Sequence, residues 1–92
     1  MSKEQHMEKI KESQRRAIWK ALRCLEAAES IGLLVVNGHK ELACEQKNWE
    51  SKAHNFYREA GFDDLPTFDL HRICAQICRA YENGQIQVVL FE

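Results

Sequence analysis

Apolar residues recur every three or four positions from the seventh residue onward, a spacing that places them on one face of a helix. The pattern predicts a helix from about residue 4 to residue 30, and its polar start predicts that residues 1–8 fray or project. Ser30-Ile31-Gly32 is expected to end this helix, because glycine accepts the left-handed conformation that closes one. The predicted face consists of Met7, Ile10, Gln14, Ala17, Ala21, Cys24 and Ala28, with Ile18, Leu22 and Leu25 alongside.

Two short aliphatic runs predict strands. Leu33-Leu34-Val35-Val36 is apolar and half β-branched, which is typical of a buried strand. Ile86 to Phe91 predicts a second strand at the end of the chain. We expect the two strands to pair into a small ribbon that the helices cover, in a direction that the sequence leaves open.

A second helix is predicted after the first strand. It opens near His39, behind an Asn37-Gly38 turn, and Gly61 is expected to cap its end. Its apolar face consists of Leu42, Gln46, Trp49, Ala53, Phe56 and Ala60.

A third helix follows the Asp63–Thr67 connector. Either Asp64 or Thr67 is expected to cap its start, and Asn83-Gly84 to stop it. Its apolar face consists of Leu70, Ile73, Cys74, Ile77 and Tyr81. The expected fold class is therefore α+β, with three dominant helices and a minor two-stranded β-sheet in a single compact domain over residues 1–92.

Charge is balanced over the whole chain but unevenly distributed along it. The 92 residues carry 13 Lys and Arg against 14 Asp and Glu, a formal net charge of −1. Residues 1–25 have a net charge of +4, and residues 26–92 have one of −5. This asymmetry indicates that the two parts face different surroundings.

Two features of the chain bear on its compartment. No apolar run approaches the roughly 18 residues that a membrane span needs, and the opening Met-Ser-Lys-Glu lacks the apolar segment of a secretory signal. Both predict a cytoplasmic protein without a membrane partner. In that compartment the four cysteines are expected to be reduced thiols.

One cluster has the residue types of a metal site. His71, Cys74 and Cys78 fall within about 60° of one another on an ideal helix, and Cys24 or Cys44 would supply a fourth zinc ligand. The spacing differs from the usual zinc-finger patterns. The alternative is that Cys74 and Cys78 belong to the buried face of the third helix, and we expect no metal and no cofactor.

The sequence carries no signature of catalysis. It has no nucleophile elbow, no cysteine-protease signature and no phosphate-binding glycine loop. Asp63-Asp64 pairs two carboxylates, but in a turn, where aspartate is common. We therefore expect no enzyme and no catalytic residues.

Trp19 is the candidate anchor of a binding surface. On a helical wheel it lies about 140° from the centre of the apolar face, among Arg15, Arg16 and Arg23. Tryptophan together with arginine is typical of a binding hot spot. The alternative is that the C-terminal strand or the third helix covers Trp19.

The connector before the third helix is a second candidate surface. It presents Leu65 and Pro66 beside two aspartates, and binding residues often lie in loops held by a rigid scaffold. The preferred interpretation of its two aromatic residues, Phe62 and Phe68, is that they turn inward and pack.

Nucleic-acid binding is the alternative use of the first helix. Arg15, Arg16, Lys20 and Arg23 form a basic stripe that would neutralise phosphates. Glutamates are interleaved with this stripe, and a face of mixed charge is more often simply solvated.

The chain as a whole resembles a phage family. The resemblance lies in its size, in the opening Met-Ser-Lys-Glu-Gln-His leading into Lys-Glu-Ser-Gln-Arg-Arg-Ala-Ile-Trp-Lys, and in the Asp-Asp-Leu-Pro-Thr-Phe connector. In these features it is similar to the accessory recombination proteins of lambdoid phages, which bind the host RecBCD nuclease-helicase. The resemblance implies a non-enzymatic modulator in the host cytoplasm that protects phage DNA or redirects recombination. Inhibitors of other host defences, including anti-CRISPR proteins, share this character and remain an alternative.

Overall fold

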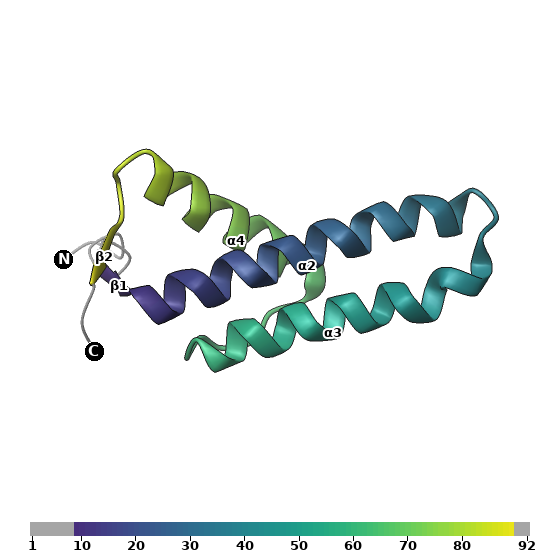
Figure 1. Ribbon diagram of the computed structural model, residues 1–92, viewed down its shortest axis with the longest axis horizontal. Coiled ribbons are helices and arrows are strands. Elements are labelled where there is room, and N and C mark those ends of the chain that lie inside the picture. Colours follow the sequence, from purple (N-terminus) through teal and green to yellow (C-terminus); the bar gives the residue numbers. More distant parts are fainter. Residues whose placement is uncertain (1–8, 90–92) are drawn as a thin grey trace.

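The computed structural model describes residues 9–89, which form three α-helices, a short 3-10 turn and one pair of short strands. In chain order the elements are β1 (Lys9–Lys11), α2 (Glu12–Val36), η1 (Lys40–Leu42), α3 (Ala43–Glu59), α4 (Thr67–Glu82) and β2 (Gln87–Val89). Figure 1 shows α2 and α3 as a long hairpin, with α4 beside the first half of α2. The presence of three helices in one domain is confirmed, but the first begins at Glu12 and ends at Val36 where the prediction was about residue 4 to residue 30. Residues 1–8, which are expected to fray, and 90–92, which end the predicted last strand, lie outside the described residues.

A pair of parallel strands, not a helical turn, occupies the start of the described chain. β1 pairs with β2, and Ile10 lies opposite Val88. The last predicted strand therefore pairs with residues that the periodicity assigns to the first helix. Ile10 and Ile86 are both buried at this end of the core. Lys11 N–H donates to Gln14 Oε1 at 3.0 Å where α2 begins, as in a capping box.

Gly32 does not end the first helix. α2 continues through Leu33–Val36, so the strand predicted there is wrong. A short aliphatic run is compatible with helix or strand, and here α3 lies alongside it (Figure 1). The helix ends at Val36, the N–H of the C-cap residue Asn37 donates to Leu33 O at 3.1 Å, and Gly38 adopts a left-handed φ of 113°.

The core lies around α2, which contacts both α3 and α4. Ala21 on α2 and Ala53 on α3 are fully buried, and such small residues let two helices approach closely. Trp49 packs against this core, as its place on the predicted face of α3 suggests. The other buried members of the core are Ile10, Ile18, Cys24, Leu25, Tyr57, Leu70, Cys74, Ile77 and Ile86.

The three helices differ in length. α2 has 25 residues and α4 has 16, which at 1.5 Å per residue gives about 37 Å and about 24 Å. The end of the α2–α3 hairpin therefore extends beyond α4 (Figure 1). Within residues 9–89, no helix combines the length and the apolar composition that crossing a membrane requires.

Candidate functional site

Trp19 lies on α2 with 51% of its surface exposed. The guanidinium carbon of Arg23, one turn further along the helix, lies 5.5 Å from the centre of the Trp19 ring. This is the separation of a cation–π contact. Trp19 is therefore not buried. The alternative interpretation, in which the C-terminal strand or the third helix covers Trp19, is wrong.

The three arginines predicted to surround the tryptophan all pair with glutamates of the same helix. Arg15 Nη2 lies 2.8 Å from Glu12 Oε2, and Arg16 Nε lies 3.3 Å from the same oxygen. Arg23 Nη1 lies 3.5 Å from Glu26 Oε1. The hydrogen bond from Arg15, together with the charges of Arg15 and Arg16, lowers the pKa of Glu12. Because two guanidinium groups share one carboxylate, this part of α2 keeps an excess of positive charge.

A pocket of about 160 Å³ opens beside Trp19, between α2 and α4. It is lined by Arg15, Ile18, Trp19, Ile77, Cys78, Tyr81 and Glu82. Ile18 and Ile77 are buried and form its floor. The guanidinium carbon of Arg15 lies 5.2 Å from the centre of the Tyr81 ring. The pocket therefore combines an apolar interior with a charged rim.

The second predicted surface lies at the other end of α4. Leu65 packs partly buried against the core, and Pro66 is exposed. The pocket involves the last turns of α4, about 16 Å from Pro66 along the helix axis at 1.5 Å per residue. The structure therefore does not bring Leu65 and Pro66 together with Trp19.

The two aromatic residues that flank the connector behave differently. Phe62 packs inward, stacked on Tyr57 with 5.1 Å between the ring centres. Phe68 is 79% exposed, so the prediction that it also turns inward is wrong. Phe68 is the second residue of α4, and its position on the helix turns it away from the buried Leu70 and Cys74.

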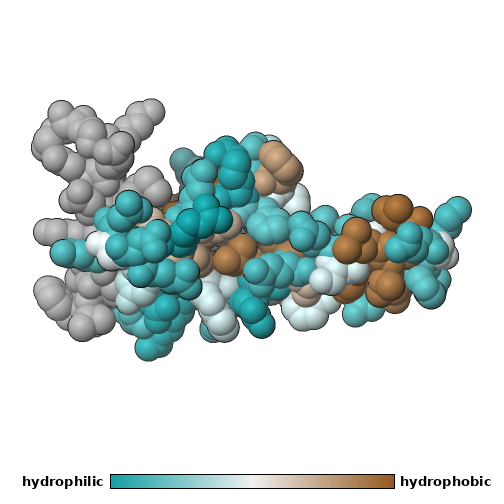
Figure 2. All heavy atoms as spheres, turned by 90° about the horizontal axis from the view of Figure 1, so that it is seen from above, coloured by the Kyte–Doolittle hydropathy of each residue, from teal (hydrophilic) through white to brown (hydrophobic). Residues whose placement is uncertain are grey.

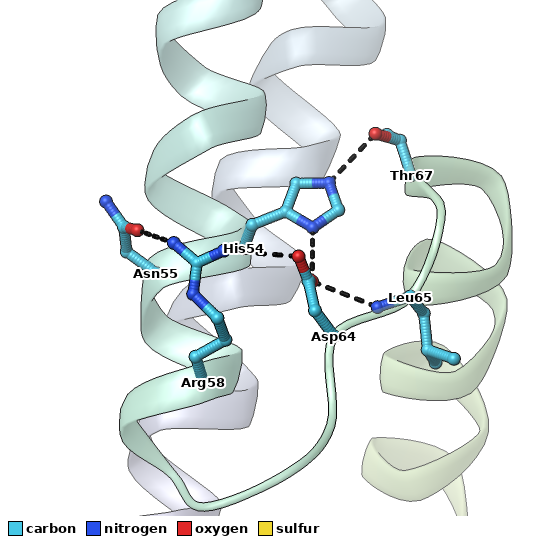
Figure 3. Close-up of polar contacts among 6 residues, drawn as sticks. All are labelled: His54, Asn55, Arg58, Asp64, Leu65 and Thr67. Carbon is cyan, nitrogen blue, oxygen red and sulfur yellow. Dashed lines mark hydrogen bonds and ion pairs between the residues drawn. The ribbon is translucent and has the colours of Figure 1, made fainter.

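A polar cluster that sequence reasoning missed fastens the connector to α3 (Figure 3). His54 Nδ1 lies 2.6 Å from Asp64 Oδ1, and His54 Nε2 lies 2.9 Å from Thr67 Oγ1. Arg58 Nη1 donates to Asp64 Oδ2 at 3.2 Å, and the Leu65 N–H donates to Asp64 Oδ1 at 2.9 Å. The two histidine contacts join residues ten and thirteen positions apart, so no local pattern indicates them.

This cluster acts on Asp64 and on the start of α4. The hydrogen bond from His54, followed by the Leu65 amide and the charge of Arg58, lowers the pKa of Asp64. The cap predicted at Asp64 or Thr67 is wrong, because Pro66 occupies the N-cap position of α4. Hydroxyl, imidazole and carboxylate follow the same order in hydrolase triads. Here the same order of groups holds the connector against α3, since both His54 and Arg58 of α3 contact Asp64.

The thiols are distributed over the core and the surface. Cys24 and Cys74 are buried, and burial raises the pKa of Cys74 to about 12. Cys78 is partly buried, and this burial raises the pKa of its thiol too. Cys74 therefore belongs to the buried face of α4, as the alternative to a zinc site predicts, whereas Cys44 is exposed. Among the described residues, no three His, Cys, Asp or Glu side chains are arranged to hold a metal ion.

The end of the α2–α3 hairpin exposes aliphatic side chains (Figure 2). Leu33, Leu34 and Val36 are 64%, 45% and 84% exposed, and we call these three residues the hairpin tip. Sequence reasoning missed this surface because it assigned the three residues to a buried strand. In α2 they lie beyond the reach of α4, which leaves them uncovered.

Comparison with protein-family models, with curated proteins and with solved structures found no match for this chain. A function must therefore be inferred from the geometry of its own residues. Among these, the surface around Trp19 combines an exposed aromatic ring, a pocket and an excess of positive charge.

Proposed function

We propose that this chain is a non-enzymatic binding module that docks on a larger protein complex through Trp19, with Arg15, Arg16 and Arg23 around it. The observation that carries the proposal is the 51% exposure of Trp19 on an otherwise charged face of α2. Tryptophan and arginine are enriched among hot-spot residues, and a half-exposed indole gains free energy when a partner covers it. Leu65 and Pro66, at the other end of α4, are not part of this surface.

As the partner we propose a host protein complex. The resemblance to phage accessory recombination proteins makes the RecBCD nuclease-helicase the first candidate. In this proposal the chain acts in the host cytoplasm and modulates that complex, which protects phage DNA or redirects recombination. The alternative target is another host defence system, which an inhibitor of the anti-CRISPR type would engage through the same surface.

Nucleic-acid binding is the second candidate function. It is favoured by the basic stripe of Arg15, Arg16, Lys20 and Arg23 on α2, where three arginines pair with two glutamates, Glu12 and Glu26. All three arginines already contact those glutamates, which reduces the charge that phosphates would meet. This function would give affinity for DNA or RNA alone that falls steeply with salt.

Affinity capture from a bacterial lysate tests the proposal. The tagged wild-type chain and Phe68→Ala, a matched loss of an exposed aromatic residue, should both retain one stoichiometric protein complex at moderate salt. Trp19→Ala should lose it, since truncating a hot-spot tryptophan costs about 2 kcal/mol or more of binding free energy. Recovery of RecB, RecC and RecD would support the named complex.

Two outcomes would count against the proposal. Circular dichroism first establishes that each variant is folded. If a folded Trp19→Ala chain captures as much of the protein complex as wild type does, Trp19 is not the anchor. Capture of nucleic acid alone, lost at higher salt, would favour the basic stripe instead.

A further inference from the structure

The pocket beside Trp19 has the size and charge for one kind of occupant. We infer that it receives a single apolar side chain of phenylalanine or leucine size from the partner protein, and that acidic residues flank that side chain in the partner's sequence. This inference rests on the proposed function and specifies the chemistry of the partner.

The volume limits the occupant to one side chain. The pocket measures about 160 Å³, and an apolar cavity of about 150 Å³ in another protein holds one benzene ring. Trp19 and Tyr81 supply aromatic walls, and the buried Ile18 and Ile77 supply the floor. Such surroundings favour an aromatic or branched aliphatic group, which gains from edge and face contacts with the two rings.

Arg15 lines the pocket, and Arg16 shares the Glu12 carboxylate with it; together they select the residues beside that side chain. Glu12 accepts from Nε and Nη2 of Arg15, whereas a guanidinium group carries five N–H donors. Arg16 reaches Glu12 through Nε, and its side chain is mostly exposed. Both arginines therefore keep N–H groups that can donate to a partner carboxylate, the anion that a guanidinium fork binds best.

Glu82 determines which side of the pocket the acidic residues take. It lines the pocket from α4, where it would repel a second carboxylate. An acidic flank is therefore placed over α2, above Arg15 and Arg16. A partner segment with lysines beside its apolar side chain would face these two arginines and be disfavoured by like charge.

Three blocked tripeptides test the inference by nuclear magnetic resonance of the ¹⁵N-labelled full chain. The probe is acetyl-Asp-Phe-Glu-amide, compared with the Ala-for-Phe peptide and with acetyl-Lys-Phe-Lys-amide. We expect saturable shifts at the Trp19 indole N–H and at nearby amides of α2 and α4. Lysine flanks should weaken binding by about tenfold or more, and alanine in place of phenylalanine should abolish saturation.

Variants separate the pocket from the rest of the surface. Arg15→Gln should reduce the preference for acidic flanks, and Phe68→Ala should leave the affinity unchanged. If Arg15→Gln does not fold, the affinities of the three peptides for the wild-type chain still test the inference. Equal affinity for acidic and basic flanks, shifts that map to the hairpin tip, or no saturation with any peptide would overturn the inference.

The inference and the proposed function can fail separately. A host complex that is captured in a Trp19-dependent way, without any peptide selectivity, would overturn the inference and leave the function in place. Peptide selectivity with no captured complex would support the pocket and count against a host complex as its partner.

Discussion

Gly32 of α2 lies directly against the end of the Gln46 side chain of α3. A Cβ atom at position 32 would come within 2.7 Å of Gln46 Nε2. Positive φ values occur at Gly38, Gly61 and Gly84 but not at Gly32, which has helical neighbours on both sides. The glycine expected to end a helix therefore lies inside α2, where its neighbour on α3 is the end of a flexible side chain.

Gly32→Ala should be neutral or should raise the free energy of unfolding by up to about 1 kcal/mol, because alanine is the better helix former. The clash is with the flexible end of Gln46, which can turn aside. Urea unfolding followed by circular dichroism measures the change. Gly38→Ala is the control: its φ of 113° should make that variant less stable by about 1 kcal/mol. Destabilisation of Gly32→Ala as large as that of Gly38→Ala would contradict the helical assignment.

Two leucines in helices provide a matched test of burial. Leu70 is fully buried in α4, whereas Leu33 at the hairpin tip is 64% exposed. Leu70→Ala should lower the free energy of unfolding by about 2–5 kcal/mol, and Leu33→Ala by less than about 1 kcal/mol. The midpoints of urea unfolding compare them. A large loss for Leu33→Ala would mean that residues 33–36 are buried, as the predicted strand requires.

Asp64 should make stability depend on pH in acid. Its contacts with His54, Leu65 and Arg58 lower its pKa below the ordinary value of 3.8. A carboxylate whose pKa is lower in the folded state stabilises fully above its unfolded pKa, and this stabilisation is lost as pH falls through the folded value. The melting temperature of wild type should therefore exceed that of Asp64→Asn above about pH 5, where Asp64 is ionised in both the folded and the unfolded chain.

That difference in melting temperature should shrink as the pH falls below the ordinary pKa of 3.8. Calorimetric melting curves between neutral and acidic pH measure it. Asp63→Asn removes the neighbouring carboxylate, outside the His54 contacts, and should show no comparable trend. If the difference in melting temperature between wild type and Asp64→Asn is unchanged at the lowest pH, the charge of Asp64 does not contribute to stability.

The four thiols should react with a disulfide reagent at different rates. Cys44 is exposed and should react first, in the folded protein. Cys74, buried and with its pKa raised to about 12, should react only on unfolding, because the thiolate is the reactive form. Cys44→Ser should remove the fast phase. A fast phase that remains in this variant would place another thiol at the surface.

The sequence by itself determined the helices and most of their buried faces. Ala53, Leu70, Cys74 and Ile77 recur at helical spacing and are all buried, because the periodicity of a helix is a local property that neighbouring residues encode. The sequence placed Trp19 opposite the apolar face but left open whether other elements cover it, and its exposed fraction of 51% in the structure decides between the two alternatives. The arginines beside it were visible from their spacing alone.

Only the tertiary structure decided what lies between distant segments. The aliphatic run Leu33–Val36 suits a strand as well as a helix, and its helical form and exposure depend on the paths of α3 and α4. The pairing of β1 with β2 and the contact of His54 with Asp64 join residues that no repeat connects. The pocket beside Trp19 exists because α4 returns along α2. Such features depend on packing between elements, which the local order of residues does not specify.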